Sequence, residues 1–345
     1  MTPSRLKASL FLCFHLFLLV FLVVWFRNAI FMFMDDFQTD TIPSAELQYL
    51  REEIHLASKN MSLDNLKAAE WLPNVSGHEP LIPKIIHQTW KTDTVPEKWK
   101  AAQESCLALH PDYKYILWTD EMSRNFIAEH YPWFLKYFDA YPYNVQRADA
   151  IRYFVLLHYG GIYIDLDDGC QRRLDSLLYY PAVFRRTDPV GVSNDVMGSV
   201  PGHPFFSFII SKLASNAKSY IFPYPTIMFS TGPLSISFLW ENYKNHLPKD
   251  SSASARIRIM LEEDYKLSNE SYFTYFEGSS WHEKDASFIL WANKHILGLI
   301  VFGFSTYFVL SYFVFSKFLD SRLCERCFFS RQHKVTLPLS EQEDV

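Results

Sequence analysis

Two aspartates at the end of a short apolar run are the residues of this chain best suited to chemistry. Asp165 and Asp167 follow the apolar residues 162–164, which a glycine pair precedes. Side chains alternate along a strand, so aspartates spaced i, i+2 leave a strand end on the same side. Crowded carboxylates repel each other unless a hard divalent cation lies between them and a second anion. The pattern therefore predicts Mg²⁺ or Mn²⁺ bridging to a diphosphate such as that of a nucleotide sugar, although most tripeptides of this kind are solvated loops.

A second pair of charged residues precedes these aspartates. Residues 144–159 are expected to form a helix that ends at Gly160-Gly161, where glycine can adopt a left-handed C-cap. Asp149 and Arg152 are three residues apart and share one face of that helix. A carboxylate beside a guanidinium can hydrogen-bond sugar hydroxyls and neutralise part of a diphosphate. Taken alone, the spacing favours an ordinary intrahelical ion pair.

Strands and helices alternate through the middle of the chain. Strands are expected at 84–90, 113–118 and 162–164, and helices at 98–109, 120–130 (capped by Thr119 or Asp120) and 144–159. This alternation predicts an α/β fold with a mainly parallel sheet flanked by helices, in which ligands bind at the carboxyl ends of strands. Asp165 and Asp167 fall at such an end. Later segments suggest helices at 204–220 and 234–243, a loop at 220–225 and a strand at 272–276.

Two apolar stretches, 8–26 and 296–315, are each long enough to cross a bilayer. A cleaved signal peptide is the alternative for the first, but no small-residue cleavage site follows it. Arg5 and Lys7 precede the first stretch, and five basic residues follow the second. The positive-inside rule therefore places both termini in the cytosol and residues of about 35 to 294 in the lumen.

The expected organisation is a cytosolic N-terminus (1–7), a transmembrane signal anchor (8–26), a lumenal stem (27–80), a lumenal catalytic domain (81–290), a transmembrane helix (296–315) and a cytosolic tail (316–345). Asn60, Asn74 and Asn269 are candidate N-glycosylation sites in the lumenal part. Cys106 and Cys170 also lie there, either as one disulfide or as two unpaired cysteines. Aromatic residues in 205–210 and 220–229 could face the membrane, with burial in the core as the alternative. The net charge of −5 gives no reason to expect a nucleic acid partner.

Three motifs occur in order along the chain: residues 82–90 (Ile-Pro-Lys-Ile-Ile-His-Gln-Thr-Trp), residues 147–167 around the aspartates, and residues 278–282 (Gly-Ser-Ser-Trp-His). Together they resemble glycosyltransferase family 32 over about residues 82 to 283. The resemblance implies a GT-A fold and a retaining transfer from a nucleotide sugar. The wording Asp-Leu-Asp-Asp-Gly-Cys and the two flanking spans look most like the branch of this family that moves mannose from GDP-mannose to inositol phosphorylceramide in sphingolipid biosynthesis.

The resemblance also implies roles for individual residues. Asp167 would ligate Mn²⁺ or Mg²⁺, Asp165 would contact the ribose or reach the metal through water, and His282 would be a late metal ligand. Asp149 and Arg152 would hold the donor sugar. The end of the first strand would lie against the base, with Gln88, Thr89 and Trp90.

Further expectations concern the compartment and the partners. The resemblance implies a Golgi membrane enzyme, with the endoplasmic reticulum as the other compartment, a sphingolipid acceptor and a separate membrane regulatory subunit. Three alternatives stay open: an α-mannosyltransferase acting on protein-linked glycans, a non-catalytic membrane subunit, and a haloacid-dehalogenase-type phosphohydrolase, which would need a later lysine on the aspartates. Galactose and N-acetylglucosamine are not distinguished from mannose by the residues alone.

Overall fold

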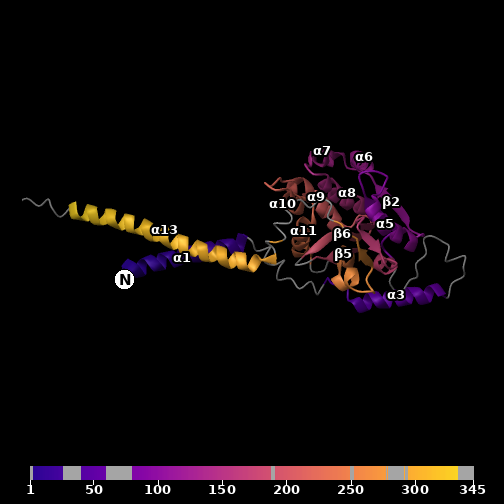
Figure 1. Cartoon of the computed structure of the whole chain (residues 1–345), viewed down its shortest axis with the longest axis horizontal. Helices are drawn as coiled ribbons and strands as arrows, with labels where there is room; N and C mark the ends of the chain where they lie inside the picture. Colours follow the sequence, from indigo (N-terminus) through magenta and orange to yellow (C-terminus); the bar gives the residue numbers. More distant parts are fainter. Residues whose placement is uncertain are drawn as a thin grey trace, which may run out of the picture. The chain divides into compact units, whose positions relative to one another are not determined.

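In the computed structural model, the described residues are 3–25, 40–59, 80–187, 191–248, 252–276, 278, 291 and 294–332. They belong to two compact units (Figure 1). One unit is made of residues 28–285, and the other combines the terminal segments 1–27 and 286–345.

Two helices, α1 (Pro3–Trp25) and α13 (Ile296–Gln332), make up the terminal unit. They contact each other, with Nε2 of His15 3.2 Å from Oγ of Ser311. In α13 the segment Gly298–Lys317 is long and apolar enough to cross a membrane, in agreement with the span predicted at 296–315. Among the described residues of α1, the apolar part is only Phe11–Val24, shorter than 18 residues, so the span predicted at 8–26 is not confirmed.

A six-stranded mixed sheet is the centre of the larger unit, in the order β2-β1-β3-β6-β5-β7. The strands are β1 (Ile85–Thr89), β2 (Lys114–Trp118), β3 (Gly161–Ile164), β5 (Ala182–Arg186), β6 (Val192–Ser199) and β7 (Arg258–Met260). As predicted, β1 pairs in parallel with β2 and β3. Strand β6, however, is antiparallel to both β3 and β5. The β5–β6 connection is short, and a short connection can join only antiparallel strands. The sheet is therefore mixed but still mainly parallel, because β6 alone among its six strands runs in the opposite direction.

Helices cover the sheet and begin at recognisable signals. They are α3 (Ser44–Lys59), α5 (Glu97–Leu109), α6 (Asp120–His130), α7 (Pro132–Ala140), α8 (Asn144–Tyr159), α9 (Pro204–Asn216), α10 (Pro223–Ser230) and α11 (Pro233–His246). The predicted bounds of α6 and α8 are confirmed, and Thr119 caps α6 by accepting a hydrogen bond from the backbone of Met122. Helices α7 and α10 were missed. Both begin with proline, which suits the first turn of a helix but reads equally as a loop.

Shorter elements complete the unit. They are the 3₁₀ helices η1 (Asp175–Tyr179) and η2 (Ala253–Ala255), the π-helix η3 (Glu263–Leu267), and a two-stranded antiparallel sheet of β4 (Asp168–Cys170) and β8 (Phe273–Tyr275). Strand β4 begins with the residue that follows Asp167, so this small sheet fixes the chain on the far side of the aspartate pair.

Side chains on the two faces of the main sheet enter two separate cores. Tyr163 and Phe184 join the core that contains helices α6 to α9 and α11. Ile162, Ile164 and Val183 join the core that contains α3, α5 and η1. This alternation is the period of two expected for strands buried on both faces. Residues 205–210 contribute to the first core through Phe205, Phe206, Ile209 and Ile210, so the idea that they face the membrane is wrong.

Part of the segment expected to be a stem is built into this unit. The backbone N–H of Ile42 donates to the carbonyl oxygen of Ile259 at 2.8 Å, and Leu47 and Leu50 of α3 are buried. Order therefore begins well before Pro80. Leu47, Leu50 and Ile54 recur with the period of a helix, a signal that the polar composition of 35–80 concealed.

Two glycines with positive φ form the junction between α8 and β3. Gly160 has φ 65° and Gly161 has φ 95°. The carbonyl of Gly160 accepts a hydrogen bond from Nε2 of His87 at 2.9 Å, while Trp118 donates to Nδ1 of the same ring. Burial lowers the pKa of His87 to about 4, so the ring is neutral and can do both. The end of α8 is thereby held directly against the start of β3.

Gly161→Ala should destabilise the protein more than Gly202→Ala. Both glycines have positive φ, so either alanine costs about 1–2 kcal/mol of backbone strain. A Cβ at Gly161 would also lie 2.7 Å from the carbonyl oxygen of Ile85, whereas nothing lies within 4 Å at Gly202. We expect Gly161→Ala to lower the free energy of unfolding by about 3 kcal/mol or more, measured by denaturant titration. Equal losses for the two variants would contradict the close approach at Gly161.

Candidate active site

A cavity of about 1320 Å³ opens at the carboxyl ends of β1, β2 and β3. Asp165 and Asp167 line it, and so do Asp149 and Arg152 from α8. The structure therefore brings together the two charged pairs that the sequence singled out. The pair on α8 and the pair after β3 lie close together because α8 passes directly into β3.

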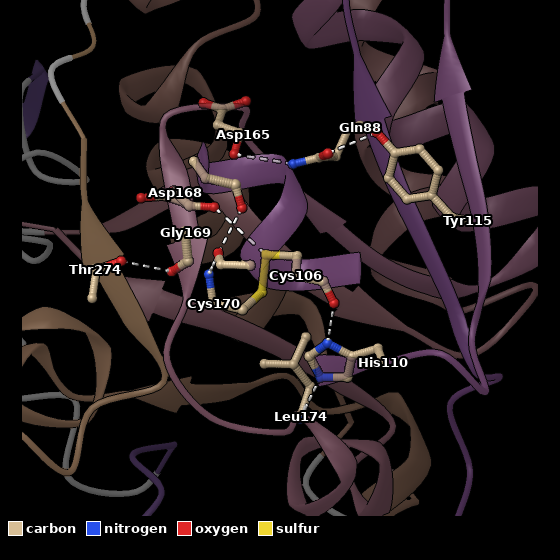
Figure 2. The surroundings of a disulfide bond; sticks show 12 residues. Gln88, Cys106, His110, Tyr115, Asp165, Asp168, Gly169, Cys170, Leu174 and Thr274 are labelled. Atoms are coloured by element: carbon tan, nitrogen blue, oxygen red, sulfur yellow. Dashed lines mark hydrogen bonds between the residues drawn. A yellow bond between two sulfur atoms is a disulfide. The ribbon is translucent and has the colours of Figure 1, made fainter. Parts of the chain in front are cut away.

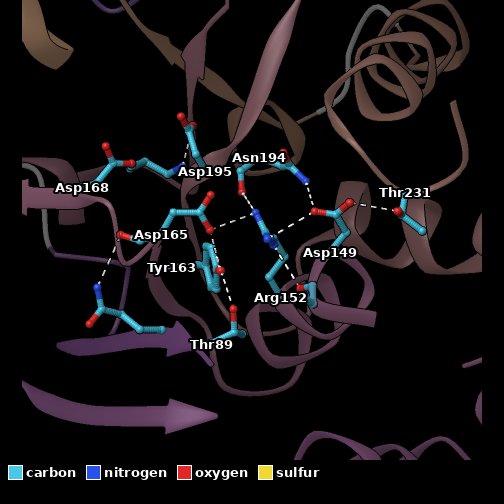
Figure 3. Close-up of polar contacts among 12 residues, drawn as sticks. Thr89, Asp149, Arg152, Tyr163, Asp165, Asp168, Asn194, Asp195 and Thr231 are labelled. Atoms are coloured by element: carbon cyan, nitrogen blue, oxygen red, sulfur yellow. Dashed lines mark hydrogen bonds and ion pairs between the residues drawn. The ribbon is translucent and has the colours of Figure 1, made fainter. Parts of the chain in front are cut away.

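Arg152 joins the two pairs into one cluster (Figure 3). Its guanidinium nitrogens lie 3.2 Å from Oδ1 of Asp149 and 3.2 Å from Oδ1 of Asp165. It also donates to the carbonyl oxygen of Asn194 at 2.7 Å and lies over the ring of Tyr163. The pair is thus more than an intrahelical contact, because Arg152 connects α8 with β3 and β6.

Asp149 is buried and its two oxygens are both occupied. Asn194 Nδ2 donates to Oδ1 at 2.9 Å, and Thr231 Oγ1 donates to Oδ2 at 2.9 Å. Burial raises the pKa of Asp149, and the charge of Arg152 opposes this shift. Asp149 therefore lines the cavity and also holds Arg152, Asn194 and Thr231 in position.

Asp165 is more accessible, with 29% of its side chain exposed. The hydroxyl of Tyr163 donates to Oδ1 at 2.7 Å and lies 2.8 Å from the hydroxyl of Thr89. Burial, together with the charges of Asp167 and Asp195, raises the pKa of Asp165 to about 8 against the opposing charge of Arg152. Such crowding of carboxylates is relieved by a bound cation.

Asp167 differs from its neighbours in its charged contacts. Within the described part of the chain, no lysine or arginine nitrogen lies within 4 Å of it, in contrast to Asp165 and Asp168. Its pKa is raised by burial, which the charge of Lys266 opposes. A half-buried carboxylate at the cavity wall, with no cationic side chain among the described residues to neutralise it, is suited to ligate a metal.

A second charged network, which the sequence did not reveal, lies beside the aspartates. Asp168 is fully buried, with Nζ of Lys266 2.5 Å from its Oδ1. Arg185 donates from Nε to Asp195 at 2.8 Å, and the hydroxyl of Tyr265 lies within 3.0 Å of both Asp168 and Asp195. Asp168 belongs to the aspartate motif, but Arg185, Asp195 and Lys266 are far from it in the chain and carry no motif, so only the tertiary structure brings them to the cavity.

The three residues predicted to lie against the base are placed differently from one another. Thr89 and Trp90 line the cavity. Gln88 is buried, accepts a hydrogen bond from the hydroxyl of Tyr115 at 2.8 Å, and approaches the carbonyl oxygen of Asp165 with Nε2 at 3.5 Å. In this position Gln88 supports the backbone of Asp165 and does not line the cavity.

Cys106 and Cys170 form a disulfide, which decides between the two alternatives left open by the sequence (Figure 2). It ties α5 to β4 two residues after Asp168, and the backbone N–H of Cys170 donates to Oγ of Ser105 at 2.9 Å. The bridge closes a sequence separation of 64 residues. Closing a loop of this size stabilises a fold by roughly 2–4 kcal/mol, and here it fixes the segment that carries the aspartates.

The charges of the cluster fit a divalent cation. When all carboxylates are ionised, five aspartates (Asp149, Asp165, Asp167, Asp168 and Asp195) face three cationic side chains (Arg152, Arg185 and Lys266), which leaves two negative charges for a cation to neutralise. Among the described residues, no three His, Cys, Asp or Glu side chains form a complete metal site by themselves. One or two carboxylates together with substrate phosphates are the usual ligands of Mg²⁺, so the donor set fits a metal that arrives with a diphosphate.

Several predicted sites fall outside the described residues. They are His282, Asn60 and Asn74. Gly278, four positions before His282 in the sequence, is described and lies directly against the carboxylate of Asp167, since a Cβ there would meet Oδ2 at 1.6 Å. Asn269 is exposed at the surface, as a glycosylation site must be.

Replacing Arg152 should destabilise the whole domain. Arg152→Met would leave Asp149 and Asp165 without their shared cation, and removing one partner of a buried ion pair costs about 3–5 kcal/mol. We expect that loss in the free energy of unfolding, measured by denaturant titration. The double variant Asp149→Asn with Arg152→Met should recover part of it, because the buried carboxylate is then neutral. Additive losses would mean that the two side chains are not coupled.

Comparison with known proteins identifies the family to which this chain belongs. Residues 96–184 match the family described as "Glycosyltransferase sugar-binding region containing DXD motif". The chain is 63% identical to "Inositol phosphoceramide mannosyltransferase 2" of Schizosaccharomyces pombe over 98% of both chains. It is 57% identical to "Mannosyl phosphorylinositol ceramide synthase CSH1" of Saccharomyces cerevisiae over 65% of this chain and 59% of that one. The solved "PaToxG Glycosyltransferase" is 20% identical, covering 59% of this chain and 81% of its own, with a TM-score of 0.38. The chain therefore belongs to the inositol phosphoceramide mannosyltransferase family of glycosyltransferases.

Proposed function

We propose that this protein transfers mannose from GDP-mannose to the inositol of inositol phosphorylceramide, with retention at C1, in a domain of the GT-A type. The observation that carries the proposal is the cavity in which Asp165, Asp167, Asp149 and Arg152 converge, in a chain 63% identical along 98% of its length to a protein named for this transfer. The proposed metal is Mn²⁺ or Mg²⁺, held by Asp167, by Asp165 directly or through water, and by His282. The contact of Gly278 with Asp167 supports the role of His282.

The residues of the cavity have distinct tasks in this mechanism. Arg152 presents its guanidinium to the donor sugar and diphosphate while Asp149 holds it in place. Thr89 and Trp90 line the part of the cavity proposed for the base. When bound, the metal ion would supply electrostatic stabilisation of the leaving diphosphate. Because the fold fixes these charges before reaction, little reorganisation is needed when charge develops on the diphosphate.

The transfer itself needs no covalent intermediate on the protein. The bond between C1 of mannose and the β-phosphate oxygen breaks, and its electron pair stays on the phosphate. The inositol oxygen forms the new bond to C1 on the same face, and its proton passes to the departing diphosphate. Trapping a mannosyl-enzyme adduct would contradict this front-face displacement.

The proposed location is supported by helix α13 and by the disulfide. A two-pass Golgi protein with a lumenal domain, working with a separate membrane regulatory subunit, would present this cavity to a lipid acceptor. The candidate membrane helix Gly298–Lys317 supports attachment to the membrane. The disulfide between Cys106 and Cys170 supports an oxidising compartment such as the lumen.

The full-length protein in detergent with Mn²⁺ should move label from GDP-mannose into inositol phosphorylceramide. Asp167→Asn should reduce the rate by about 10²–10³-fold, because it removes a metal ligand that acts in the transition state. Chelation of Mn²⁺ should have the same effect on the wild type. His282→Ala should raise the Mn²⁺ concentration needed for half-maximal rate.

Two negative results would have different meanings. Binding of GDP-mannose without labelling of the lipid would contradict the acceptor, and protein-linked glycans with the regulatory subunit present would be tried next. Absence of GDP-mannose binding would contradict the donor itself. Full activity of Asp167→Asn would refute the assigned metal site.

The aromatic segment around α10 supports a lipid acceptor. Tyr220, Ile221 and Phe222 are 49%, 92% and 57% exposed, whereas Pro223 and Tyr224, next in sequence, line the cavity. One short stretch therefore runs from an apolar surface to the cavity wall. We assign this surface to the acyl region of the acceptor and its bilayer.

The double variant Ile221→Ser and Phe222→Ser should slow transfer to acceptor in nanodiscs by about tenfold or more relative to transfer to water-soluble glycerophosphoinositol, because apolar area is lost from the bilayer contact. The ratio of the two rates is the measurement. Leu56→Ser, which changes another exposed apolar side chain (54% exposed), is the control and should leave the ratio unchanged. An unchanged ratio in the double variant would contradict the assignment.

A further inference from the structure

Lys266 connects the buried carboxylates with the open cavity. Its Nζ lies 2.5 Å from Oδ1 of Asp168, yet 17% of its side chain stays exposed whereas only 1% of the Asp168 side chain does. It lines the same cavity as Asp165 and Asp167. The ammonium group is therefore on the boundary between the protein interior and the space where the diphosphate would bind.

The position of Lys266 is fixed by its surroundings. It belongs to the π-helix η3, a type of turn that is rare and often found at functional sites. The preceding residue, Tyr265, reaches the same carboxylate, with its hydroxyl 3.0 Å from both oxygens of Asp168. The ring of Tyr265 lies under both Lys266 and Arg185, at 4.5 Å and 4.2 Å from their charged groups. Tyr265 and Lys266, which are adjacent in sequence, therefore both contact the carboxylate of Asp168, and these contacts restrict the rotamers of Lys266.

Neutralising Asp168 does not by itself account for this arrangement. Asp168 already receives the hydroxyl of Tyr265, and a buried ion pair contributes little net stability because both charges are desolvated. An ammonium has three N–H groups, and the exposed 17% of the Lys266 side chain lies at the cavity. The field of Lys266 also extends to Asp167, where it opposes the effect of burial. The charge therefore lies close to the residue best suited to hold the metal.

We propose that Lys266 is a catalytic residue that donates a hydrogen bond to the β-phosphate of the donor and stabilises it as it departs. This inference rests on the proposed function. As the bond from C1 to the β-phosphate oxygen breaks, the electron pair moves onto that phosphate, and Lys266 meets the growing negative charge without giving up its proton. Asp168 and Tyr265 act as positioning residues that aim the ammonium group.

The test compares binding of GDP and GMP to the full-length protein in detergent with Mn²⁺, by titration calorimetry. GDP contains the β-phosphate and GMP does not. We expect Lys266→Met to lower the affinity for GDP by about 10- to 100-fold, which is the effect of losing a charge-assisted hydrogen bond. The affinity of this variant for GMP should change less than about threefold. Its kcat for mannose transfer should fall by about 10²–10³-fold. Lys266→Arg should recover part of the GDP affinity.

Lys244→Met is the matched control. Lys244 is also a partly buried lysine, 21% exposed, that pairs with a carboxylate, Glu241, at 3.0 Å and lies over an aromatic ring, but it does not line the cavity. Its variant should bind GDP and GMP as the wild type does. If Lys266→Met lowered the affinities for GDP and GMP equally, the role of Lys266 would be structural. If GDP affinity were unchanged, Lys266 would not contact the β-phosphate. Either result overturns this inference and leaves the proposed function standing. Failure of the wild type to bind GDP would contradict the proposed donor as well.

Discussion

The site depends on the ion pairs that Arg152 makes with Asp149 and Asp165. A guanidinium shared by two buried carboxylates is stable only if its other N–H groups and the remaining carboxylate oxygens are also occupied. Here the carbonyl of Asn194 and the hydroxyl of Thr231 complete the set. Arg152 and Asp149 together thus link helix α8 to the end of β3, to β6 and to Thr231, which lies between α10 and α11.

Two backbone devices make this arrangement possible. Gly160 and Gly161 allow α8 to pass into β3 without an intervening loop, so residues of the helix and of the strand end share one wall of the cavity. On the other side of the aspartates, the disulfide and the small β4–β8 sheet hold residues 168–170. The carboxylates lie between two rigid supports, which keeps mutually repelling groups close before any cation binds.

The distribution of charge explains why this cavity is suited to a diphosphate brought by a divalent ion. Asp165 and Asp168 are matched by Arg152 and Lys266, whereas the carboxylate of Asp167 has no such partner within the described residues. The cationic side chains of Arg152, Arg185 and Lys266 line the same cavity, where the proposed nucleotide sugar would place its diphosphate. In the proposed function, different residues of one cavity would attract the metal and the phosphates.

The sequence by itself determined the local chemistry. The Asp-x-Asp spacing, the glycine pair and the Asp149/Arg152 helix face are encoded within about twenty neighbouring residues, where strand and helix periods fix geometry. The motif resemblance likewise gave the family. The tertiary structure decided which residues from distant segments reach the sheet, the core and the cavity. Strand β6 made the sheet mixed, α3 joined the core despite its polar surroundings, and Gln88 turned inward to support Asp165. Lys266, Arg185 and Asp195 reached the cavity from positions with no periodic or motif signal, because long-range pairing of charges depends on how strands and turns pack and leaves no trace in local sequence.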